Sequence, residues 1–67
     1  MFLIEVIVGN RWVPWDVADM TLRQVLEYPP RDNHNRPYKP HEWRARRILP
    51  CQRDSYNAEI RQIWQPD

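Results

Sequence analysis

The residues best suited to chemistry in this chain are its arginines, and they are unevenly placed. Seven of the ten basic residues lie between positions 31 and 53 against two acids, which gives that segment a net charge of +5. Residues 1–30 and residues 54–67 each carry a net charge of −2. Guanidinium groups bind carboxylates and phosphates through planar, multidentate hydrogen bonds. The distribution predicts a basic surface that docks on a partner.

We predict that the partner-binding residues lie on a basic strand and on the loop before it. Strand alternation sets Arg44 and Arg46 on one face and Arg47 on the other. The predicted partner-binding set is Arg36, Tyr38, Lys39, Arg44, Arg46, Arg47 and Arg53. Three interpretations remain open at this point: an acidic protein surface, nucleic-acid phosphate with stacking on aromatic rings, and a solvated face without a partner. A total net charge of only +1 favours protein over nucleic acid.

Other catalytic or metal-binding patterns are missing from the sequence. A zinc site needs four converging ligands at a recognised spacing, which His34, His41, Asp32 and Cys51 do not offer. Cys51 lacks an orienting base, so we interpret it as a small residue packed at the end of a strand. A single glycine leaves no phosphate-cradling loop. We therefore expect a non-enzymatic protein that uses no metal and no cofactor.

The remaining composition bears on organisation and location. With 67 residues the chain is expected to form one domain, 1–67. One cysteine cannot form an internal disulfide, which favours an intracellular, cytoplasmic location or indifference to redox state. The first residues lack the basic region and cleavage site of a signal peptide, and no apolar run approaches the roughly 18 residues of a membrane span.

Two strands are predicted in the first third of the chain. Residues Phe2 to Val8 are apolar on both faces, so this strand is expected to be central in its sheet. Gly9-Asn10 suits a tight primed turn. Arg11 to Val17 is the partner strand, and Pro14 places it at an edge or in a bulge. Trp12 and Trp15 are expected on opposite faces, with at most one in the main core.

A short helix and a long loop follow. Thr21 and Gln24 form a capping box, and Leu22, Val25 and Leu26 share one helical face. Pro29-Pro30 ends the helix. A basic, proline-rich loop is expected over about residues 29–41.

The last third contains a third strand and an ambiguous segment. In Glu42 to Leu49, the residues Trp43, Ala45 and Leu49 are expected to face the core, and Ile48 to face away with the arginines. Residues 56–65 fit a helix capped by Asp54 or Ser55, or a strand, and we favour the helix. The predicted fold is α+β: an antiparallel sheet of three or possibly four strands in ββαβ order, with one short helix packed on it and a C-terminal helix or strand.

This order of elements resembles the small early bacteriophage proteins that inhibit host RNA polymerase. The matching residues are Phe2–Val8, Trp12–Val17, Thr21-Leu22 with Val25-Leu26, and Trp43 to Cys51. The resemblance implies that arginines on the last strand bind an acidic region of the polymerase. Arg47 matches one of these arginines, whereas Leu49 stands at the position of the second.

The functional hypothesis is a phage or mobile-element inhibitor that docks on and blocks a host protein machine. RNA polymerase and a defence complex such as CRISPR–Cas are the two candidate targets. The alternatives are a small nucleic-acid-binding regulator, and an accessory subunit or homodimeric interaction module. The chain is expected to be a monomer or a homodimer and to bind no membrane, and the resemblance implies the cytoplasm of a bacterial host cell.

Overall fold

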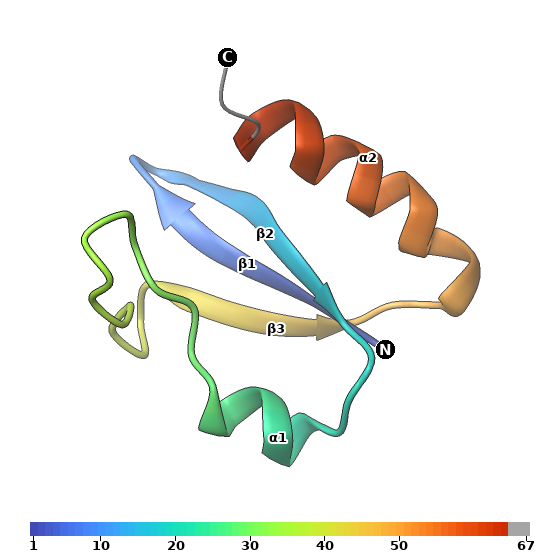
Figure 1. Cartoon of the computed structure of the whole chain (residues 1–67), viewed down its shortest axis with the longest axis horizontal. Coiled ribbons are helices and arrows are strands. Elements are labelled where there is room, and N and C mark those ends of the chain that lie inside the picture. The colour runs from blue at the N-terminus through green and yellow to red at the C-terminus, as the bar shows by residue number, and fades with distance from the viewer. Residues whose placement is uncertain (65–67) are drawn as a thin grey trace.

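The computed structural model describes residues 1–64 and contains three strands and two α-helices (Figure 1). The elements in chain order are β1 (Phe2–Val8), β2 (Arg11–Ala18), α1 (Leu22–Glu27), β3 (Trp43–Arg47), a 3₁₀ turn η1 (Pro50–Gln52) and α2 (Arg53–Trp64). The predicted α+β class and ββαβ order are confirmed. Residues 56–64 are helical, as favoured, and residue 65 of that predicted segment lies outside the described residues.

The strands form one antiparallel sheet in the order β2-β1-β3. The predicted central position of β1 is therefore correct, and its residues Phe2 to Val6 are all buried. Gly9 closes the β1–β2 hairpin with a φ of +63°, a backbone conformation that glycine adopts without steric cost. Helices α1 and α2 lie on opposite sides of this sheet (Figure 1).

Strand β2 contains a bulge at Trp15. Ile4 pairs with Asp16 and the next residue, Glu5, pairs with Pro14, so Trp15 is the extra residue. Proline cannot donate to a ladder, and its place beside a bulge on an edge strand agrees with the prediction. Trp15 packs against the main core, whereas Trp12 lies on the other face beneath Arg44.

The main core lies between α1 and one face of the sheet. Its buried residues are Phe2, Ile4, Ala18 and Val25, with Trp15, Trp43 and Ala45 packed around them. The capping box of α1 is present: the Gln24 N–H donates to the Thr21 hydroxyl, and the Thr21 N–H donates to the Gln24 side chain. The apolar face of α1 is only partly used, because Leu22 and Leu26 are exposed and Val25 alone is buried.

Helix α2 packs on the second face of the sheet over β2, and of two expectations about the end of β3 one is correct and one is wrong. Ile48 faces away from the main core as expected, although it is buried, whereas Leu49, expected in the core, is 63% exposed. The alternation assigned to this strand is correct, but β3 ends at Arg47, so Leu49 has left the sheet and leads into η1. Ile48 is two residues after Arg46, so its side chain points to the same face of the sheet as Arg46 and Leu3.

Helix α2 is attached to β2. The indole Nε1 of Trp64 donates a hydrogen bond of 2.6 Å to the carbonyl oxygen of Pro14. The helix begins at Arg53, directly after η1, so the expected caps Asp54 and Ser55 lie in its first turn instead. Within residues 1–64, no helix has the length and apolar character needed to cross a membrane.

Candidate functional site

The centre of the candidate site is a carboxylate shared by two arginines. Glu5 lies opposite Arg44 in the β1–β3 register, and Arg46 is two residues further along on the same face. The Nε atoms of Arg44 and Arg46 each donate a hydrogen bond of 2.8 Å to the same Glu5 oxygen, Oε1. We call these three residues the Glu5 cluster.

Burial and exposure differ sharply within the Glu5 cluster. Glu5 is 5% exposed, whereas the side chains of Arg44 and Arg46 are 41% and 49% exposed. A buried carboxylate is costly unless it is paired and hydrogen-bonded. The two arginines supply that pairing through Nε alone in these bonds, so their terminal guanidinium nitrogens can serve a second carboxylate. The cluster keeps a net charge of +1 on an exposed surface.

Trp12 supports this arrangement from the hairpin. The guanidinium carbon of Arg44 lies 4.3 Å from the centroid of the Trp12 ring, a cation–π contact. Arg44 is therefore held on one side by a carboxylate and on another by an indole. An arginine fixed in this way loses less side-chain entropy when it binds.

The other predicted arginines lie elsewhere. Arg47 is on the opposite face of the sheet, where its guanidinium carbon lies 5.6 Å from the Phe2 ring centroid. Arg53 opens α2, and its Nε lies 3.9 Å from a carboxylate oxygen of Asp54. Whether either residue contacts a partner stays a prediction, but the structure does not gather them with Arg44 and Arg46.

The basic loop has its own internal order. Asp32 Oδ1 accepts hydrogen bonds from the backbone N–H groups of His34 (2.8 Å) and Arg36 (3.0 Å). The bond from Arg36 lowers the pKa of the Asp32 carboxyl most, partial burial opposes it, and the bond from His34 lowers it further. Asn35 has a φ of +60° at the tip. The side chains of Arg36 and Lys39 are exposed on this loop.

Tyr38 borders a pocket of about 440 Å³ between the loop, α1 and β3. Its walls are mostly apolar or aromatic, and they consist of Leu26, Pro29, Tyr38, Pro40, Trp43, Arg44 and Ala45. We call this hollow the β3 pocket. Arg44 also borders this pocket, but its guanidinium group lies on the other face of the sheet, with Glu5 and Trp12.

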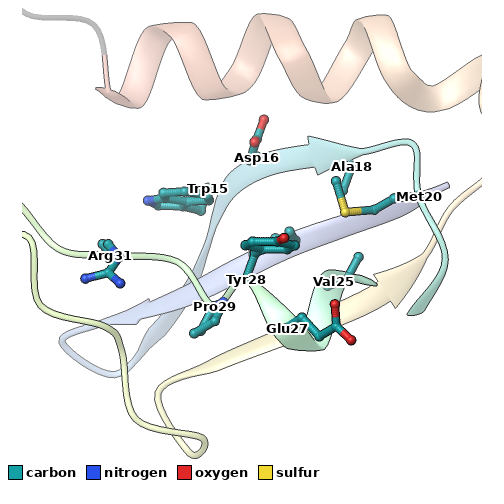
Figure 2. Close-up of a pocket in the computed structure, with 10 residues that line it drawn as sticks. Trp15, Asp16, Ala18, Met20, Val25, Glu27, Tyr28, Pro29 and Arg31 are labelled. Carbon is teal, nitrogen blue, oxygen red and sulfur yellow. The ribbon is translucent and has the colours of Figure 1, made fainter. Parts of the chain in front are cut away.

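A second hollow, of about 350 Å³, lies between α1 and β2 (Figure 2). Figure 2 shows the Tyr28 ring between Trp15 on one side and Met20, which lies beside Ala18, on the other, with Arg31 at the Trp15 end. The Asp16 carboxylate points away from Tyr28, toward α2. Arg31 Nη1 donates to the carbonyl of Asn35, so this arginine is used in ordering the loop.

Residues considered for catalysis or metal binding do not converge. Cys51 is exposed in η1, which corrects the expectation that it packs at the end of a strand. The strand ends four residues before it, so its side chain has no core to enter. Across positions 1–64, no three His, Cys, Asp or Glu side chains form a group that could hold a metal ion.

Comparison with protein-family models, curated proteins and solved structures finds no match to this chain.

Glu5 is the site residue that sequence reasoning missed. Its signal was present, because it is the one acid in a strand that is otherwise apolar on both faces. An acid in such a strand requires a cationic partner on a neighbouring strand. Its two partners stand 39 and 41 positions away, so no local pattern connects them.

Proposed function

We propose that this protein is a small binding protein that docks on an acidic surface of a larger protein and blocks it stoichiometrically. The observation that carries the proposal is the pair of arginines held on one oxygen of Glu5. Arg44 and Arg46 are positioned before a partner arrives, and about half of each side chain faces solvent. Partner carboxylates would complete the cluster by bonding the terminal guanidinium nitrogens.

The Glu5 cluster favours a protein partner over nucleic acid. Nucleic-acid binding derives much of its strength from several unneutralised lysines and arginines along a backbone of phosphates. Here Glu5 neutralises half of the charge of Arg44 and Arg46, and Arg47 points to the other face. A compact site that bonds one or two carboxylates fits this charge better than a track for phosphates.

The resemblance to phage inhibitors of RNA polymerase gives the proposal a first defined target. Purified bacterial RNA polymerase would be tested for capture and for inhibition of transcription, beside a whole bacterial lysate. The protein would be biotinylated at Cys51, its single and exposed cysteine. The proposal is supported if a protein is captured and nuclease treatment does not release it.

The test variant must not leave the buried Glu5 carboxylate without a cationic partner. Replacing only the two arginines would leave Glu5 buried without a partner, so the test variant changes Glu5→Gln, Arg44→Gln and Arg46→Gln together. The matched control changes Glu27→Gln, Arg23→Gln and Arg61→Gln, which alters the net charge equally at exposed positions outside the cluster.

The test variant is expected to lose capture at least about tenfold, with the control unchanged and both variants folded by circular dichroism. Equal capture by the test variant would overturn the proposal. A steep, log-linear loss of binding with salt, together with release by nuclease, would favour the nucleic-acid regulator instead.

A further inference from the structure

The outer edge of β3 is open in the sheet. The sheet order β2-β1-β3 leaves β3 paired on one side only. Hydrogen bonds flank the β1–β3 ladder at Ile7 N–H to Glu42 O (2.8 Å) and at Ile48 N–H to Met1 O (3.0 Å). Antiparallel alternation then turns the backbone groups of Arg44 and Arg46 toward β1 and those of Trp43, Ala45 and Arg47 outward. The latter have no backbone partner within residues 1–64.

Two surfaces border this edge on opposite faces of the sheet. On one face lie the exposed guanidinium groups of Arg44 and Arg46. On the other face lies the β3 pocket, whose walls include Trp43 and Ala45 from β3 itself. A strand paired with this edge would place alternate side chains on the two surfaces.

We propose that the β3 edge binds an extended segment of the partner protein in which acidic and apolar side chains alternate. The apolar residue opposite Ala45 enters the β3 pocket, and its two neighbours place carboxylates beside Arg44 and Arg46. This inference rests on the proposed function and specifies how the acidic partner is recognised. Main-chain hydrogen bonds supply affinity in such strand addition, and the pocket and the charges supply specificity.

Charge disfavours a second copy of this chain as the occupant. Two β3 edges paired antiparallel about Ala45 would set each Arg44 opposite an Arg46 of the other copy. Like charges directly opposite each other destabilise a strand pair. Charged side chains on an edge strand also reduce its pairing with the same edge of another copy. The same residues therefore repel a basic strand and favour an acidic one.

The test uses a nine-residue peptide of alternating aspartate and valine with leucine at its centre. Binding is followed by amide chemical shifts and hydrogen exchange on the full-length protein. The outward amides of Ala45 and Arg47 should become protected on binding. A peptide of the same composition with its aspartates grouped at one end should bind at least about tenfold more weakly, and so should the alternating peptide with its central amide N-methylated.

Three results would overturn strand addition while leaving the proposed function intact. One is binding of the N-methylated peptide as tightly as the parent, without protection of Ala45. A second concerns Ala45→Pro, which removes an outward N–H without removing a hydrogen bond of the β1–β3 ladder. If folded Ala45→Pro captures the partner as well as Ala45→Val does, the edge is not used. No binding of the alternating peptide also overturns this inference, whereas the proposed function depends separately on arginine-dependent capture.

Discussion

Arg44 and Glu5 face each other across the β1–β3 ladder, and their side chains meet at 2.8 Å. This contact has two effects. It compensates the burial of a carboxylate inside a small domain, and it fixes the direction of a guanidinium group at the surface. Arg46 repeats the same contact, so the stability of the sheet and the geometry of the proposed site depend on one acid.

Replacing that acid should destabilise the fold. Glu5→Gln keeps the shape but leaves Arg44 and Arg46 facing each other without a countercharge. Breaking a fully buried pair costs about 3–5 kcal/mol. Because both arginines are nearly half exposed, we expect about 1–2 kcal/mol here. Urea unfolding measures the difference, with Glu27→Gln as the control, which should shift stability by less than about 0.5 kcal/mol. An unchanged midpoint for Glu5→Gln would show that the cluster adds no stability.

The attachment of α2 should weaken when Trp64 loses its N–H. Trp64→Phe keeps an aromatic ring but removes the hydrogen bond to the Pro14 carbonyl. A bond of this kind contributes about 0.5–1.5 kcal/mol, which corresponds to a fall of several degrees in the melting temperature of a domain this small. Hydrogen exchange should show faster opening of α2, while Gln62→Ala, an exposed change on the same helix, leaves it near wild type. Equal protection in both variants would count against the role given to this bond.

The N-cap of α1 should matter because this helix has only six residues and one buried side chain. Thr21→Ala removes the hydroxyl that accepts the Gln24 N–H, at a cost of about 1 kcal/mol. Thr21→Ser retains the hydroxyl and should restore most of the loss. Thermal unfolding of the two variants provides the comparison. Equal melting temperatures for alanine and serine at position 21 would mean that the cap is dispensable.

The loop should respond to acid through Asp32. Its pKa is lowered below the ordinary value of 3.8, first by the hydrogen bond from the Arg36 N–H. A carboxyl with a lowered folded-state pKa stabilises the fold fully above its unfolded value, and this contribution is lost as the pH falls through the folded value. The amide signals of His34 and Arg36 should therefore shift together below pH 3.8. Asp32→Asn should abolish that shared transition, and a transition centred above pH 3.8 would contradict the assignment.

Local patterns were sufficient to predict most of the fold. The alternation of Phe2 to Val8, the glycine at the turn and the Thr21–Gln24 spacing each act within a few residues, so each could be read directly. Pro14 predicted an edge or a bulge for the same reason, and β2 has both. The arginine-bearing strand also kept its predicted alternation between faces.

The errors arose where distant elements meet. Glu5 is buried by contacts with Arg44 and Arg46, 39 and 41 positions away, and the Ile48 N–H donates to the carbonyl of Met1. Strand periodicity carries no information about such distant contacts, so the burial of these two residues was missed. Leu49 was assigned to the core because the strand was expected to be longer than it is. The candidate site was predicted to lie on the basic segment, but its organising residue lies on the first strand.

The bulge at Trp15 has a consequence for the β1–β2 hairpin as a whole. In an unbroken strand, Ala18 would share a face with Trp12 and Pro14. The extra residue shifts the phase of everything after it, so Trp12 reaches the arginine side while Ala18 enters the core beneath α1. Even-numbered residues of β2 therefore face the arginine side before the bulge and the α1 side after it. Deleting the extra residue would therefore turn the buried side chains of the second half of β2 to the opposite face of the sheet.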